Sequence, residues 1–337
     1  MLGHDAVAQA LVDHGVDTVF AVLGDGNLFI GESLERQHGV NLVGATHEAN
    51  AVCMAEGWAK ATGRLGVASV THGPGLTNTI TALVEGVKNG TPMVVVAGDT
   101  PIENEQHLQN LDQHALVVAT GAGFQPIRNV DTIAEDVSTA IRRAHSEHRP
   151  VVINIPLNIE WDEVDYEPRP ALTPTSQRLA ADPDRLETAM GIIASSARPV
   201  IVAGRGAVKS GARDALIRLG DALGAPLATS LLATGFFQGE PFDLGIHGTL
   251  SHEIAGETFA MADCLVVFGA ALNFFTTDYQ TLLAGKRVVH VDLNPAHIDR
   301  HVTVDAGVVG DATLVLSLIH ISEPTRRTPI SYAVFCL

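Results

Sequence analysis

Short apolar runs alternate with helical patterns through the first half of this chain. The runs cover residues 18–23, 40–45, 65–71, 92–97 and 150–155. Runs of this length fit strands that are buried on both faces, and their alternation with helices favours a parallel sheet with right-handed crossovers. Apolar spacing predicts helices at 5–15, 48–61, 75–88 and 131–146. A further helix is expected after Asn27 and ends at about Gln37. Residues 99–114 are polar and aperiodic, which predicts a long loop of functional importance.

A second α/β unit follows a segment that contains Pro168, Pro170 and Pro174. Strands are expected at 199–203, 226–229, 264–268 and 287–291, with helices at 183–195 and 211–223. The predicted fold class is therefore α/β, with two doubly wound parallel-sheet domains. The first domain takes residues 1–157, the linker 158–182 and the second domain 183–316.

The last residues do not continue this pattern. From Ser317 the sequence SLIHISEPTRRTPISYAVFCL shows no apolar period, and its beginning resembles the translated read-through of a sequencing-library adapter. We therefore interpret residues 317–337 as a non-native tail and leave them out of the fold. The helix that begins at Asp311 is expected to end near Leu316. This interpretation implies that the chain is a fragment and that the natural gene continues.

Charge and cysteine content restrict the classes of function. The formal net charge is −17, from 21 basic and 38 acidic residues, and such a surface repels the phosphate backbone of nucleic acids. The three cysteines, Cys53, Cys264 and Cys336, have no metal-binding spacing, and we expect the first two to be buried free thiols. Neither a signal peptide nor a run of about 18 apolar residues is present, which favours a cytoplasmic protein that does not contact a membrane.

Two predicted strand ends carry residues suited to chemistry. Glu48 follows the run 40–45, and Gly73-Pro74-Gly75 follows the run 65–71. The carboxyl ends of strands are where open α/β sheets bind ligands, so Glu48 could point into a cleft. It could equally be an acid that stabilises the start of a helix. The Gly-Pro-Gly turn has the same two interpretations, because proline and glycine are also ordinary residues of a helix start.

A family resemblance rests on these motifs taken together. Thr46-His47-Glu48, Ala59-Lys60-Ala61-Thr62-Gly63, the segment 71–78 (THGPGLTN) and the segment 92–98 (PMVVVAG) closely resemble the acetolactate synthase-like family of thiamine-diphosphate-dependent enzymes. The resemblance extends over about residues 1–316. It implies that the first domain is the pyrimidine-binding domain and that the second is the Rossmann-like central domain.

The resemblance also implies roles for individual residues. Glu48 would hydrogen-bond N1′ of the aminopyrimidine ring and so promote loss of the thiazolium C2 proton, which forms the ylide. Gln109 would lie near the reacting centre, although a solvated loop amide is the alternative. The remaining cofactor-binding residues would be Gly24, Gly26, Thr71, His72, Pro74 and Asn78. At His72 a serine is common in the family, and a simple turn histidine remains the alternative.

Metal and flavin ligands are not expected within this chain. Gly24-Asp25-Gly26 followed by Asn50 imitates the family's Mg²⁺ motif, but that motif belongs to a C-terminal domain, so we assign no metal ligands here. The segment 270–275 lacks the basic residues that would hold the pyrophosphate of FAD, and we expect no flavin. His297 and His301 have helical spacing but no third ligand, and we interpret them as surface histidines.

The predicted function is that of a truncated 2-oxo acid decarboxylase or carboligase, with magnesium as a second cofactor of the complete enzyme. The complete protein is expected to be a homodimer or homotetramer, because cofactors of this family lie between subunits. The fragment alone is expected to be inactive. The alternative is a non-catalytic α/β module that binds a nucleotide or a partner protein. The sequence does not distinguish among the 2-oxo acid substrates.

Overall fold

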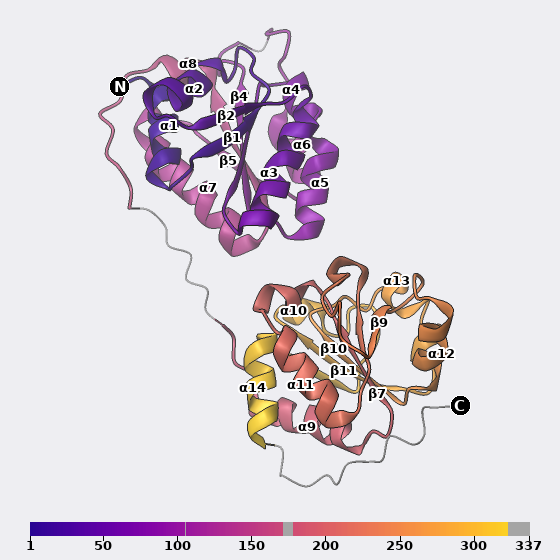
Figure 1. Ribbon diagram of the computed structural model, residues 1–337. Coiled ribbons are helices and arrows are strands. Elements are labelled where there is room, and N and C mark those ends of the chain that lie inside the picture. The colour runs from indigo at the N-terminus through magenta and orange to yellow at the C-terminus, as the bar shows by residue number, and fades with distance from the viewer. Residues whose placement is uncertain (105, 171–177, 323–337) are drawn as a thin grey trace. The chain divides into compact units, whose positions relative to one another are not determined.

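The computed structural model of the protein describes residues 1–104, 106–170 and 178–322, and they form two compact units (Figure 1). Unit 1 is Met1–Thr175 and unit 2 is Ser176–Leu337. The division falls within the predicted linker 158–182. The first part of that linker nevertheless belongs to unit 1, since Val164 is buried and its carbonyl accepts a hydrogen bond from the amino terminus of Met1 at 2.8 Å.

Unit 1 is built on one sheet of six parallel strands in the order β2-β1-β3-β4-β6-β5. The central strands are buried on both faces, as their continuous apolar runs predict. The strands are β1 (Thr18–Ala21), β2 (Asn41–Gly44), β3 (Gly66–Val70), β4 (Met93–Asp99), β5 (Gly123–Pro126) and β6 (Pro150–Pro156).

Helices cover both faces of this sheet (Figure 1). Successive side chains of a strand point to opposite faces, so Val94 and Val96 pack with α1 and α7, whereas Val95 packs with α3 and α5. The helices are α1 (Gly3–Asp13), α2 (Leu28–Glu32), α3 (Glu48–Thr62), α4 (Pro74–Thr77), α5 (Ile80–Asn89), α6 (Gln113–Ala119), α7 (Ile133–Glu147) and α8 (Leu157–Trp161), with a π-helical turn at Ser33–Gln37 and a 3₁₀ turn at Val130–Thr132.

Strand order places the switch point of the unit 1 sheet between β1 and β3. The chain moves from β1 outward to β2 and then returns to the other side of β1 to form β3. Ligands bind outside the carboxyl ends of strands at such a point, because the connections leave there in opposite directions and open a crevice. The loops after β1 and β3 are those that carry Gly24, Gly26 and the Gly-Pro-Gly turn.

Three expectations for unit 1 need correction. The helix expected at 75–88 is broken between α4 and α5, where the hydroxyl groups of Thr77 and Thr79 donate to the carbonyls three residues earlier. The loop expected at 99–114 ends two residues earlier, because α6 begins at Gln113 with Asp112 as its N-cap. The edge strand β5 was not predicted, since three of its four residues are only partly buried.

Unit 2 has a second sheet of six parallel strands in the order β12-β11-β10-β7-β8-β9. Its switch point lies between β7 and β10. The strands are β7 (Pro199–Ala203), β8 (Leu227–Thr229), β9 (Asp243–Ile246), β10 (Cys264–Phe268), β11 (Arg287–Asp292) and β12 (Ala306–Val309). The predicted fold class of two doubly wound α/β domains is confirmed.

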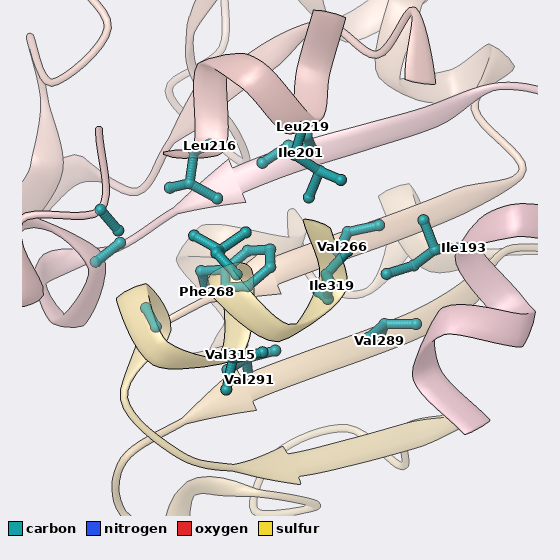
Figure 2. Packing of buried hydrophobic residues seen from close by; sticks show 14 of the residues in the cluster. Ile193, Ile201, Leu216, Leu219, Val266, Phe268, Val289, Val291, Val315 and Ile319 are labelled. Carbon is teal, nitrogen blue, oxygen red and sulfur yellow. The ribbon is translucent and has the colours of Figure 1, made fainter. Parts of the chain in front are cut away.

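The larger core of unit 2 lies between its sheet and helices α9, α11 and α14 (Figure 2). Alternate strand residues such as Ile201, Val266 and Val289 enter it, while their neighbours face α12 on the other side. The helices are α9 (Pro183–Ser195), α10 (Arg205–Ser210), α11 (Arg213–Leu223), α12 (Glu253–Met261), α13 (Phe274–Thr277) and α14 (Ala312–Ser322), with 3₁₀ turns at Leu231–Ala233, Thr281–Leu283 and Pro295–His297.

The expectation that the last helix ends near Leu316 is wrong. Helix α14 runs to Ser322, and Ile319 packs into the same core as Val315 (Figure 2). The apolar residues of 312–319 therefore continue to serve the core beyond the predicted end. Residues 323–337 of the predicted non-native tail lie outside the described residues, and the origin of the tail stays a prediction.

The cysteines differ from expectation in one case. Cys264 is buried in β10 as predicted, but Cys53 is exposed, and Cys336 lies outside the described residues. The error at Cys53 arises because α3 buries only one face, and Cys53 occupies the other. None of the helices in the described part of the chain is both long and apolar enough to cross a membrane.

Candidate functional site

Glu48 is the first residue of helix α3 and follows β2 at the ligand-binding edge of the unit 1 sheet. His47 caps the helix, since its Nδ1 accepts a hydrogen bond from the backbone N–H of Ala49 at 3.2 Å. The positive end of the helix dipole favours an anion at this position. The carboxylate is partly buried, so it remains accessible to a ligand.

Asn78 holds this carboxylate from the neighbouring loop. Its side-chain N–H donates to Glu48 Oε2 at 2.9 Å, across the 30 residues that separate them in the chain. Asn78 is the C-cap of α4 and lies at the break between α4 and α5. The structure therefore brings together two residues that lie in separate motifs of the sequence.

The loop after β1 is tied to the end of β3 through Thr71. The backbone N–H of Gly26 donates to Thr71 Oγ1 at 3.1 Å, and this hydroxyl donates to Asp25 Oδ1 at 3.0 Å. A Cβ atom on Gly24 would lie 2.8 Å from Thr71 Cβ. Glycine at position 24 is therefore required by the close approach of the two loops, whatever the site binds.

The Gly73-Pro74-Gly75 turn forms the floor next to Glu48. Gly73 has φ of +60°, a conformation that favours glycine, and the backbone of Gln109 packs directly against it. A Cβ on Gly75 would lie 2.7 Å from Thr71 Cγ2 and 3.7 Å from Glu48 Oε1. The missing side chain leaves open backbone beside the carboxylate, which suits a flat ring placed there. Gln109 is partly buried, and both its role near the reacting centre and the alternative of a solvated loop amide stay predictions.

Two buried side-chain amides, which were not among the predicted site residues, support this turn. Gln113, which is 2% exposed, accepts a hydrogen bond from the backbone N–H of Gly73 at 2.7 Å. Its own amide donates to Asn154 Oδ1 at 2.5 Å, and Asn154 donates to Asp99 Oδ2 at 2.7 Å. A polar residue inside the otherwise apolar run 150–155 is the signal that could have identified Asn154.

His72 lies beneath the loop after β1 and is fully buried. Its contact with a cofactor stays a prediction, as does the alternative of a simple turn histidine. Burial lowers the pKa of its imidazole, and the nearby Asp25 carboxylate opposes that shift. Asp25 is exposed, and its Oδ2 lies 3.9 Å from His72 Nε2. His107 faces the same point, with its ring centroid 5.3 Å from that of His72. Neither Asp25 nor His107 was among the predicted site residues.

These residues fit the pyrimidine half of thiamine diphosphate. An accessible carboxylate held by an amide can share a proton with a ring nitrogen. The glycine backbone beside it leaves room for the ring to pack. Pro74 starts α4 and is exposed at the same edge. The residues named so far at this edge come from the segments that directly follow β1, β2, β3 and β4. They include Gly24, Asp25, Gly26, Glu48, Thr71, His72, Pro74, Asn78 and Gln109.

The corresponding edge of unit 2 is different. Gly204 and Gly269 follow β7 and β10, and a Cβ on Gly204 would lie 2.2 Å from the carbonyl oxygen of Gly269. The two glycines thus allow the two turns to pack together, which explains them without a ligand. His297 Nδ1 lies 3.1 Å from Asp292 Oδ1, within hydrogen-bond distance of that carboxylate. The expectation of no flavin stays a prediction.

Comparison with known proteins agrees with the two-unit architecture. The family domain described as thiamine pyrophosphate enzyme, N-terminal TPP binding domain, matches residues 1–116. The thiamine pyrophosphate enzyme central domain matches residues 186–319. These matches fall in unit 1 and unit 2 respectively.

Curated relatives resemble the chain along almost its whole length. A probable acetolactate synthase large subunit of Methanocaldococcus jannaschii is 31% identical, over 94% of this chain and 55% of the relative. A sulfoacetaldehyde acetyltransferase of Rhodobacter capsulatus is 30% identical, over 94% of this chain and 54% of the relative. The acetolactate synthase isozyme 3 large subunit of Escherichia coli is 30% identical, over 97% of this chain and 59% of the relative. The chain thus spans about half the length of the curated relatives it matches. It belongs to the thiamine pyrophosphate enzyme family, of which it carries the N-terminal and central domains.

Proposed function

We propose that this chain provides the pyrimidine-binding part of a thiamine-diphosphate-dependent enzyme that decarboxylates or ligates 2-oxo acids. The observation that supports the proposal most is the Glu48–Asn78 hydrogen bond at the switch-point edge of unit 1. A helix-start acid needs no such partner, since the dipole alone stabilises it. An amide that fixes the carboxylate is what a directed proton-sharing contact requires.

In this proposal Glu48 shares a proton with N1′ of the aminopyrimidine. Its Oε2 is held by Asn78, which leaves Oε1 beside the bare backbone of Gly75 for the ring. When bound, thiamine diphosphate supplies the nucleophilic carbon and the electron sink for cleavage next to the carbonyl of a 2-oxo acid. A glutamine at position 48 could form a hydrogen bond but could not exchange the proton.

The other residues would orient the cofactor and the substrate. Thr71, Gly24 and Gly26 fix the wall of the site, and Pro74 and Gly75 form its floor. Gln109 lies against the Gly73 turn, from which its side chain could reach the substrate. We assign these residues to positioning and keep the proton-sharing role for Glu48.

Several properties of the whole protein belong to this proposal. Magnesium and the diphosphate would be held by residues outside the described part of this chain, and the complete protein would assemble as a homodimer or homotetramer in the cytoplasm. The curated relatives include acetolactate synthases and a sulfoacetaldehyde acetyltransferase, which fits ligation as well as decarboxylation. The 337-residue polypeptide alone is expected to release no carbon dioxide from pyruvate.

Calorimetric titration of the chain in magnesium buffer tests the proposal. Thiamine diphosphate is expected to bind at one site and more tightly than ADP or FAD. Tighter binding of ADP or FAD would instead support the alternative of a nucleotide-binding module. Cofactor-dependent release of carbon dioxide by this polypeptide would contradict the assignment of only half a site to it.

A further inference from the structure

Asp25, His72 and His107 meet at the ligand-binding edge of unit 1 although 82 residues separate the first from the last. One potential ligand atom from each of the three lies within 4.8 Å of those of the other two. The loop after β1 supplies Asp25, the end of β3 supplies His72, and the long loop after β4 supplies His107. The proposed cofactor contacts leave the purpose of this grouping unexplained.

The hydrogen bonds of Thr71 determine which nitrogen of His72 carries a proton. The Thr71 hydroxyl donates its only hydrogen to Asp25 Oδ1 at 3.0 Å. At the contact between Thr71 Oγ1 and His72 Nδ1, 3.5 Å long, the hydroxyl oxygen must therefore be the acceptor and Nδ1 the donor. The neutral ring then has a lone pair on Nε2.

This lone pair has no partner in the described residues. His72 Nε2 is buried and makes no hydrogen bond within the described part of the chain. The nearest charged atom is Asp25 Oδ2 at 3.9 Å, which is also an acceptor. Two acceptors that face each other across a short gap repel unless a proton donor or a cation lies between them.

We propose that Asp25, His72 and His107 bind one divalent transition-metal ion of the Zn²⁺ class. Two imidazoles and one carboxylate suit zinc and the other first-row ions of its class, whereas Mg²⁺ prefers a shell of oxygen atoms. The site is therefore chemically distinct from a magnesium site for diphosphate. Three protein ligands leave a coordination position open, which a carbonyl or carboxylate oxygen would take.

Binding requires a small closure of the three side chains. Donor atoms lie at about 2.0–2.2 Å from a zinc ion, so their mutual separations must shrink by about 1 Å from those in the structure. His72 is fixed by burial, whereas Asp25 is exposed and His107 is partly exposed on its loop, so the latter two can move. His107 Nδ1 now accepts a hydrogen bond from the backbone N–H of Gln109 at 3.2 Å, which in the neutral ring leaves the proton on Nε2. Coordination through either nitrogen must break this hydrogen bond, and coordination through Nε2 must also move its proton to Nδ1.

Titration of the untagged chain with Zn²⁺, and with Co²⁺ as an absorbing probe, tests this inference without any thiamine diphosphate. The wild-type chain is expected to bind one equivalent, with visible Co²⁺ bands of low coordination number. Asp25→Asn and His107→Gln each remove one ligand and are expected to weaken metal binding at least ~30-fold. Mutation of residues that only support a ligand already weakens metal binding by ~10–100-fold, and loss of a ligand itself should not fall at the low end of that range. Both side chains are accessible, so neither variant should unfold the chain, and tryptophan fluorescence verifies this.

The control is His297→Gln, which removes a histidine from the Asp292 ion pair of unit 2 and should change the affinity less than twofold. Among the 15 histidines of the chain, several can bind zinc weakly at the surface. Binding that survives in Asp25→Asn and His107→Gln would identify such surface binding only and would overturn the proposal. Absence of stoichiometric binding in the wild type would overturn it as well. Neither result affects the proposed thiamine diphosphate site, which is tested by its own titration.

Discussion

The side-chain amide of Asn78 donates to Glu48 Oε2 at 2.9 Å and thereby joins the start of α3 to the break between α4 and α5. The two residues come from different loops of the sheet, Glu48 after β2 and Asn78 after β3. The carboxylate is consequently fixed by one oxygen and free at the other. This arrangement links a local irregularity of the chain to the chemistry proposed for the site.

Asn78→Ala should weaken thiamine diphosphate binding about fivefold, since a hydrogen bond of this kind contributes about 1 kcal/mol net. The carboxylate remains but loses its fixed orientation. Calorimetric dissociation constants measure the effect. Asn50→Ala is the matched control, because Asn50 is exposed on the same helix as Glu48, and its affinity should equal that of the wild type. Equal affinities for both variants would show that Asn78 does not orient Glu48.

Gln113→Leu should destabilise unit 1 by about 3 kcal/mol, because it leaves the N–H of Gly73 and the side-chain oxygen of Asn154 buried without these partners. Urea unfolding followed by tryptophan fluorescence reports on unit 1 alone, since both tryptophans, Trp58 and Trp161, belong to it. Gln106→Leu on the same loop is exposed and should change the stability by less than about 0.5 kcal/mol.

Gly98→Ala and Gly57→Ala should have opposite effects on unit 1. A Cβ on Gly98 would lie 2.2 Å from the carbonyl oxygen of Gly26, so the loop after β1 must shift, at a cost of about 1–3 kcal/mol. Gly57 lies inside α3 with open space around it, and alanine there should stabilise the unit by about 0.5–1 kcal/mol. The same urea unfolding measures both. A neutral Gly98→Ala would show that the β1 loop is not held against β4.

Glu160 should make the stability of unit 1 fall as pH rises. Burial, aided by the Asp25 charge, raises the pKa of this carboxyl from 4.5 to about 8 in the folded chain. Between these values the unfolded state releases a proton that the folded state retains, so the free energy of unfolding decreases with pH, by a total on the order of 4 kcal/mol. Glu160→Gln should abolish this decrease and be more stable than the wild type at pH 8.

Unfolding by urea at several pH values between 5 and 9, followed by tryptophan fluorescence, measures the slope. Glu163→Gln is the control, because Glu163 is exposed on the same segment and should keep the wild-type slope. A wild-type stability that does not change over this range would mean that Glu160 finds a partner or reaches solvent.

The parts of the fold that the sequence predicted are those with an unambiguous burial pattern. Strands β3, β4, β6, β7 and β10 are buried throughout and appear as continuous apolar runs. The edge strands β5, β9 and β12 are partly exposed, so their sequences lack both the apolar run and a strict alternation. The continuation of α14 was missed because a compositional resemblance outweighed the apolar residues that reach Ile319.

The site was predictable only where a motif is contiguous. Glu48 and Asn78 each belong to a short segment that resembles the family, and the structure brings them into contact. Gln113 and Asp25 act through partners that are 40 and 46 residues away, a relationship that only the order of the strands creates. Spacing along the sequence cannot indicate such contacts without knowledge of the switch point between β1 and β3.

The most direct test of the central claim compares thiamine diphosphate binding by the wild-type chain, Glu48→Gln and Glu35→Gln. Glu35 is an exposed acid elsewhere on unit 1, and its variant has the same change in net charge. The account predicts that Glu48→Gln weakens binding about tenfold, because replacing the charged partner of the ring by a neutral amide costs about 1.5 kcal/mol. Glu35→Gln should bind within twofold of the wild type. Equal affinity of Glu48→Gln and the wild-type chain would contradict it.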